Sequence, residues 1–313
     1  VEGAWQHVET HALSTTSARE LAPFLAAVRL TRWLATEPRK STDLVDAVRV
    51  HMTDGAWVDA AVNDALAGAD DPGLANGLAS VAGAAQARRR DDERVFARHL
   101  ALATPTLDSI GQISPSDGQP PVWTIESLLP EVVLPLAKKA PVLMLVMDGM
   151  SAATATEIVD DAIERHGWFE AALLGAASDA RACAVAALPT LTSVSRASLL
   201  AGRLTTGEQG AERRDYAGLT HSVGKLSASL FHKKDVDTLT PGWALSDDVG
   251  RAISDPDVAL VTVVLNTIDD ALDRSDPAGT TWTADAVKHL EPLLSRARAA
   301  GRTVIMTVDH GHI

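Results

Sequence analysis

The sequence predicts an α/β protein, a three-layer α/β/α sandwich with a mainly parallel sheet, preceded by a helical region. Three largely apolar segments, 142–147, 258–265 and 303–308, each have the length of a buried strand. Helix-like stretches at 152–166 and 284–300 lie between them or beside them. Apolar strands that alternate with helices are typical of a parallel sheet covered on both faces.

The first 104 residues have a different pattern, which predicts helices. Apolar side chains recur every three or four residues in 20–34 and 41–52. Residues 88–94, RRRDDER, carry both charges at helical spacing and are expected to form a solvated helix face. A Pro-, Gly- and Ser-rich stretch then indicates a boundary. We therefore expect three parts, a helical region at 1–104, a linker at 105–138 and a second domain at 139–313.

Composition limits the class of protein. The 313 residues include 28 Lys and Arg against 41 Asp and Glu, a net charge of −13. This charge does not favour nucleic acid or anionic lipid as a partner, although a local basic patch could bind nucleic acid. The single cysteine, Cys183, cannot form an intramolecular disulfide, which suits a cytoplasmic protein. No apolar run reaches the roughly 18 residues of a membrane span, so no membrane partner is expected.

The ends of the chain suggest a piece of a longer protein. The first residue is Val1 rather than Met, and the last, Ile313, follows closely on a predicted strand. We therefore expect the second domain to be truncated at its C-terminus.

Acidic residues follow all three predicted strands. Asp148 follows the first strand, Asp269 and Asp270 follow the second, and Asp309 with His310 follows the third. One such acid is usually a turn residue or a helix cap. The carboxyl ends of parallel strands meet at one edge of a sheet, however, and carboxylates that converge there repel one another unless a cation joins them. The sequence therefore predicts a metal site at this edge.

A cluster of hydroxyl residues precedes a short apolar stretch. Residues 188–202 read LPTLTSVSRASLLAG. One interpretation is a helix cap followed by a buried helix. The other places one hydroxyl at a helix N-terminus beside a metal ion, where it would act as a nucleophile on an anionic substrate. Spacing alone does not decide between the two.

Four motifs in order resemble the PglZ family of the alkaline phosphatase superfamily. They are VLMLVMDGMS, LPTLTSVSRASLLAG, LNTIDDALD and VDHGH, within residues 139–313. The resemblance implies an alkaline-phosphatase-like fold and metal-dependent hydrolysis of phosphate mono- or diesters in the bacterial phage-defence systems Pgl and BREX. It also implies other BREX or Pgl proteins as partners, a phosphate ester as substrate, and divalent Zn, Mn or Mg ions as cofactors, two in the full-length protein.

The resemblance assigns the first metal and the nucleophile. Asp148 matches the metal-ligating Asp after the first strand of the superfamily. The nucleophile of the superfamily, which is also a metal ligand, is often a Thr, Ser or formylglycine ten residues before a Gly. Counting back from Gly202 gives Thr192, which is therefore preferred over Thr190, Ser193 and Ser195. Arg196, four residues later, matches a catalytic Arg of sulfatases.

The last motif supplies the remaining ligands of that metal. Its D-H pair falls on Asp309 and His310, which would share the metal with Asp148 and Thr192. His312 repeats the D-H-x-H spacing of alkaline phosphatases, in which the second His supports a ligand from the outer shell.

The second metal site departs from the superfamily pattern. Asp269 matches its Asp, with Asp270 competing for the role, but the His expected four residues later is Asp273. An all-carboxylate arrangement favours Mn or Mg over Zn by ligand softness. The third ligand would lie beyond Ile313.

Two functions follow from this pattern. The first is a phosphohydrolase in which Thr192 attacks phosphorus. The alternative is a catalytically weak scaffold or sensor subunit of the defence complex, suggested by Asp273. A sulfatase is excluded, because threonine cannot be converted to formylglycine. Residues 231–235, FHKKD, are expected to form a solvated loop, although their cations could meet a phosphate-bearing substrate.

Overall fold

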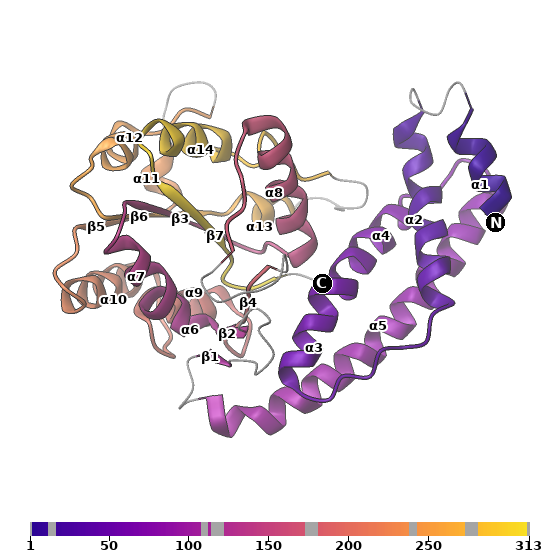
Figure 1. The fold of residues 1–313 in the computed structure, drawn as a ribbon, viewed down its shortest axis with the longest axis horizontal. Helices are drawn as coiled ribbons and strands as arrows, with labels where there is room; N and C mark the ends of the chain where they lie inside the picture. Colours follow the sequence, from indigo (N-terminus) through magenta and orange to yellow (C-terminus); the bar gives the residue numbers. More distant parts are fainter. Residues whose placement is uncertain are drawn as a thin grey trace. The chain divides into compact units, whose positions relative to one another are not determined.

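The computed structural model of the chain contains two compact units (Figure 1). The first holds the N-terminal 104 residues, and the second holds nearly all of the remainder. The residues that the structure describes are 2–11, 17–107, 112–113, 122–172, 181–237, 243–272 and 281–311. The predicted site residues Asp273 and His312 lie outside these ranges.

The N-terminal unit is helical, as predicted. Leu30 and Trp33 pack against Val58, Val62 and Ala85 in an apolar core, because the three- and four-residue spacing places them on facing helix sides. No helix in the described ranges combines the length and apolar character needed to cross a bilayer. The helices of the unit are α1 (Glu2–Glu9), α2 (Ala18–Leu34), α3 (Leu44–Val50), the π-helical η1 (His51–Gly55), α4 (Ala56–Leu66) and α5 (Pro72–Leu107).

The charged run on α5 is only partly solvated. Arg89 is buried and donates two hydrogen bonds to the Asp59 carboxylate on α4, at 2.8 and 3.1 Å. Arg88 lies over the Trp33 ring, 3.9 Å from its centroid, and donates to the Trp33 carbonyl at 2.8 Å. The expectation of a fully solvated face was therefore wrong, because α5 turns one side of this run onto α2 and α4.

The second unit is built on a parallel four-stranded sheet. Its strands lie in the order β5-β6-β3-β7, and all three neighbouring pairs are parallel. The predicted parallel α/β architecture is thus confirmed. The short strand β5, with partly exposed residues, was not predicted. The bounds are β3 (Val142–Met147), β5 (Ala228–Phe231), β6 (Leu260–Leu265) and β7 (Thr303–Thr307).

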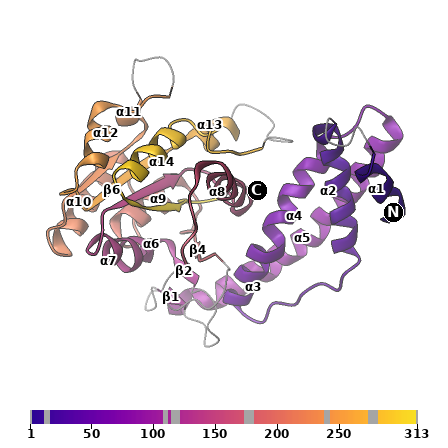
Figure 2. The ribbon, with the colours of Figure 1, turned by 45° about the horizontal axis from the view of Figure 1, so that its top comes forward.

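Helices cover both faces of this sheet (Figure 1, Figure 2). All six residues of β3 are fully buried, and alternate side chains enter two separate cores. Leu143 and Leu145 pack with α8 (Ala152–His166), α12 (Asp247–Ser254) and α14 (Leu290–Ala299). The intervening residues of β3 pack with α6 (Ile125–Leu128), α7 (Leu134–Ala137), α9 (Thr192–Ala201) and α10 (Gln209–Ser222).

Residues 122–137 belong to the second unit, although we expected the segment 105–138 to be a linker. They form β2 (Val122–Thr124), α6, the π-helical η2 (Leu129–Val133) and α7. Leu129 and Leu134 are fully buried against the sheet, so the Leu and Val side chains of the segment give it a packed structure. Strand β2 pairs with β1 (Gln112–Ile113) and β4 (Cys183–Val185) in a second, smaller sheet.

A buried arginine connects the amino ends of the strands to a neighbouring helix through hydrogen bonds. Arg302, 3% exposed, lies just before β7. Its guanidinium donates five hydrogen bonds to main-chain carbonyls, so that it caps the C-terminal end of α12 and holds that helix against the sheet. The acceptors are the carbonyls of Val142, Ala252, Ile253, Asp255 and Val258.

Replacing Arg302 should destabilise the second unit strongly. The Arg302→Met variant leaves these carbonyls without their donor in a buried place, and we expect it to lower the free energy of unfolding by about 3–5 kcal/mol. Urea unfolding followed by circular dichroism measures the change. The control is Arg251→Met on α12, where the side chain is 76% exposed and the change should stay within about 0.5 kcal/mol. Equal effects of the two variants would contradict the role assigned to Arg302.

Candidate functional site

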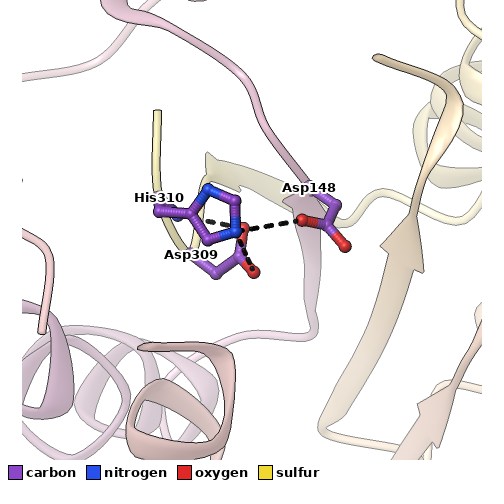
Figure 3. Close-up of side chains that lie close together, drawn as sticks. All are labelled: Asp148, Asp309 and His310. Carbon is purple, nitrogen blue, oxygen red and sulfur yellow. Dashed lines mark hydrogen bonds and ion pairs between the residues drawn. The ribbon is translucent and has the colours of Figure 1, made fainter. Parts of the chain in front are cut away.

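The adjacent strands β3 and β7 bring two acids and a histidine together. Asp148 follows β3 directly, and Asp309 and His310 follow β7, which pairs with β3. One ligand atom from each of these three residues lies within 4.8 Å of the other two. His310 Nε2 is 3.6 Å from Asp148 Oδ1 and 3.7 Å from Asp309 Oδ2. Figure 3 shows the imidazole pointing toward both carboxylates. We call these three residues the Asp/His cluster.

The carboxylates of the Asp/His cluster are buried and incompletely paired. Asp148 is 1% exposed and Asp309 is 0% exposed. Within the described part of the chain, Asp148 Oδ1 and Asp309 Oδ2 have no hydrogen-bond partner. Buried polar atoms are nearly always paired, and these two carboxylate oxygens together with the nearby imidazole are a group that could hold a metal ion.

Burial and mutual repulsion change the acidity of the cluster. Burial, together with the charge of Asp309, raises the pKa of Asp148 to about 6. Burial also raises the pKa of Asp309. The shift of Asp148 expresses the free-energy cost of burying its charge beside a second negative charge, and the shift of Asp309 expresses the cost of burying its charge. A bound cation would remove this cost.

The other oxygen of each carboxylate is held in place. Asp148 Oδ2 accepts hydrogen bonds from Asn266 Nδ2 at 2.6 Å and from an Arg196 Nη atom at 2.9 Å. Asp309 Oδ1 accepts from the main-chain N–H of His310 at 3.0 Å. Each carboxylate is therefore oriented through one oxygen, which leaves the other toward the centre of the cluster.

Thr192 presents its hydroxyl to the Asp/His cluster. It is the first residue of α9, half-buried, and its Oγ1 lies 3.0 Å from His310 Nε2. Ser195, a competing hydroxyl, is fully buried and donates to the Asp309 carbonyl at 2.5 Å. Ser195 also accepts from the Ala187 N–H, at 3.1 Å, so its contacts are those of a structural residue.

Arg196 is buried against Asp148 of the cluster. It is 7% exposed, and its guanidinium donates to Asp148 Oδ2 and, through Nε, to Glu212 Oε1 at 3.0 Å. Glu212 in turn contacts His232 Nε2 at 2.6 Å. Sequence reasoning missed Glu212, which stands in a charged helical stretch. It placed His232 in a solvated loop, which was wrong, because this histidine is 1% exposed.

The residues predicted for a second metal are not part of the Asp/His cluster. Asp269, in the first turn of α13 (Thr267–Leu272), lies beside Gly149. A Cβ atom on Gly149 would come within 3.3 Å of Asp269 Cβ, and the φ of Gly149 is +74°, so glycine is required there. Asp270 forms an ion pair with Lys233 of α11 (Lys233–Val236). Asp273 and His312 lie outside the described residues.

A comparison with protein families identifies the family to which the second unit belongs. The family model for the BREX system PglZ alkaline phosphatase-like domain matches residues 128–313, more than half of the chain. The chain belongs to the PglZ family. The resemblance seen in the four motifs is thus confirmed, and the PglZ domain includes the helices from residue 128 onward. The protein is a BREX-associated, alkaline-phosphatase-like protein. No curated protein matches the sequence significantly.

Neutralising Asp148 should stabilise the metal-free protein. The pKa of Asp148 is about 6 in the folded state, above the ordinary value of 3.8. The folded protein therefore binds more protons than the unfolded chain between these values, and its free energy of unfolding falls as the pH rises through them. Asp148→Asn keeps an acceptor for Arg196 and Asn266 and removes the charge.

In the presence of a chelator, we expect the free energy of unfolding of Asp148→Asn to exceed that of the wild type by on the order of 2–3 kcal/mol above pH 7. At pH 4 the two free energies should be nearly equal. Urea unfolding between pH 4 and pH 8 measures the gain. The same variant should lose binding of Mn²⁺ or Zn²⁺ in calorimetric titration. A variant that is less stable than the wild type at pH 8 would contradict this electrostatic description.

Proposed function

We propose that this protein is a metal-dependent hydrolase of phosphate mono- or diesters, with Thr192 as its nucleophile, that acts in BREX phage defence. The main support is the position of the Thr192 hydroxyl, 3.0 Å from His310 Nε2. That nitrogen also faces the unpaired oxygens of two buried carboxylates. The hydroxyl can serve as a nucleophile, and the imidazole with the two carboxylate oxygens can hold a metal ion that activates it for phosphoryl transfer.

The Asp/His cluster fits a divalent cation in both charge and chemistry. Asp148 Oδ1, Asp309 Oδ2 and His310 Nε2 would hold it. With Glu212 and Arg196 included, three carboxylates and one guanidinium leave a charge of −2 when all are ionised. The mixed oxygen and nitrogen donors suit Zn or Mn better than Mg. A bound cation would lower the pKa of the nearby hydroxyl and offset the charge of the phosphate.

Helix α9 provides the rest of the nucleophile's surroundings. Thr192 stands at its first position, so the positive end of the helix dipole faces the place where a phosphate would lie. The hydroxyl oxygen would bond to phosphorus as the bond to the leaving alcohol breaks, and its proton would go to that alcohol or to solvent. Water would then cleave the bond between phosphorus and Thr192 and release phosphate from a monoester.

The family also supports a setting for this activity. We infer that the protein assembles with other BREX proteins, because the matching domain is described as part of that system. The single cysteine suits a protein that works in the reducing cytoplasm. The net charge of −13 does not favour nucleic acid as the substrate, so phosphate esters in general are the substrate class that we propose.

Removing the Thr192 hydroxyl should abolish turnover. With p-nitrophenyl phosphate and bis(p-nitrophenyl) phosphate as substrates and Mn²⁺ or Zn²⁺ present, we expect Thr192→Ala to lower kcat/KM by about 10³-fold or more. Thr192→Ser keeps a hydroxyl at the same place and should retain activity within about tenfold. Spectrophotometric assay of nitrophenolate release measures both rates.

The matched control is Thr190→Ala, two residues earlier. Thr190 is exposed, and its loss should change the rate less than about twofold. Equal turnover by the wild type and Thr192→Ala would overturn the proposed nucleophile. That outcome would favour the alternative, a scaffold or sensor subunit that keeps the fold without catalysis.

A further inference from the structure

A buried chain of charged side chains leads away from the Asp/His cluster. Asp148 Oδ2 contacts Arg196, Arg196 Nε contacts Glu212 Oε1, and Glu212 Oε2 contacts His232 Nε2, at 2.9, 3.0 and 2.6 Å. None of these four residues is more than 7% exposed. They come from the end of β3, from α9, from α10 and from the residue before α11, so four separate segments meet in this chain of contacts.

The hydrogen-bond directions along this chain follow from the charge of Glu212. Burial by itself would raise the pKa of Glu212, but the hydrogen bond from His232 and the charge of Arg196 outweigh it and lower the pKa. Glu212 is therefore a carboxylate and accepts on both oxygens. His232 Nε2 must then carry a proton and donate it. The Glu212 carboxylate is thus fixed from both sides, and it fixes the Arg196 guanidinium in turn.

Stability alone does not account for this arrangement. Buried ion pairs of this kind are often no more stabilising than apolar residues of similar size. Here the guanidinium and Asn266 both donate to Asp148 Oδ2, which turns Oδ1 toward His310 and Asp309. Asp148 can accordingly offer only one oxygen to a cation. Without the charge of Glu212, the full positive charge of Arg196 would compete with a cation for Asp148.

We infer that Glu212 is a positioning residue of the metal centre: it holds Arg196 so that Asp148 binds a cation through Oδ1 alone, and it offsets the guanidinium charge. Arg196 is a positioning residue as well, not a residue that contacts the substrate. The inference rests on the proposed metal centre and adds a residue that none of the four sequence motifs contains.

The test is metal affinity, measured without any substrate. Isothermal titration of the metal-free protein with MnCl₂ or ZnCl₂ should show that Glu212→Gln binds the ion about 10- to 100-fold more weakly than the wild type. The matched control is Tyr216→Phe, one turn along α10. Tyr216 is buried and hydrogen-bonded to Thr262 at 2.9 Å, and its loss should change the affinity less than about twofold.

A second variant separates positioning from substrate contact. Arg196→Lys keeps the charge but cannot span both carboxylates, so it too should weaken metal binding. At saturating metal its KM for p-nitrophenyl phosphate should equal that of the wild type, and excess metal should restore much of kcat. A raised KM at saturating metal would instead place Arg196 at the substrate and overturn its positioning role.

The outcomes distinguish this inference from the proposed function. A wild-type protein that binds neither ion would overturn both. A wild type that binds the ion, with Glu212→Gln unchanged in affinity, would overturn the role of Glu212 alone. Circular dichroism of each variant checks that it folds. If Glu212→Gln does not fold, Arg196→Lys becomes the test, and a metal affinity of Arg196→Lys equal to that of the wild type would overturn the inference.

Discussion

The burial of two like charges side by side is the constraint on which the site depends. Asp148 and Asp309 lie at the carboxyl ends of neighbouring parallel strands, and both are almost wholly inaccessible to solvent. Such a pair is unfavourable in a metal-free protein, as the raised pKa values of both groups indicate. The surrounding residues orient the pair and compensate its charge only in part. Among the described residues, one oxygen of each carboxylate accepts a hydrogen bond and the other accepts none.

The two ends of the sheet have different tasks. At the amino ends of the strands, Arg302 satisfies main-chain carbonyls and ties helix to strand, a contribution to stability. At the carboxyl ends, charged side chains are buried with incomplete pairing, which lowers stability at the place where we propose that a cation and an anionic substrate bind. This division agrees with the general rule that ligands bind at the carboxyl ends of parallel strands. The buried apolar side chains of strands such as β3 contribute stability that offsets the cost of these buried charges.

Much of the fold and part of the site could be predicted from the sequence, because both depend on local patterns. The run of apolar residues before Asp148 predicts a buried strand, and the same run places Asp148 at the carboxyl end of that strand. The helix that starts at Thr192 could be counted from Gly202, which adopts the left-handed conformation that ends it. The partners of buried charges could not be predicted. Glu212 and Arg89 lie in charged helical stretches, and only the packing of other segments decides which charge is turned inward.

The central claim is that a cation belongs between Asp148, Asp309 and His310, and diffraction at a metal absorption edge tests it most directly. Crystals of the protein grown with ZnCl₂ or MnCl₂ should give an anomalous peak about 2.0–2.2 Å from Asp148 Oδ1, Asp309 Oδ2 and His310 Nε2. Thr192 Oγ1 should lie next to that peak. Fully metal-loaded crystals with no anomalous density among these three atoms, or with the ion bound elsewhere, would contradict the account.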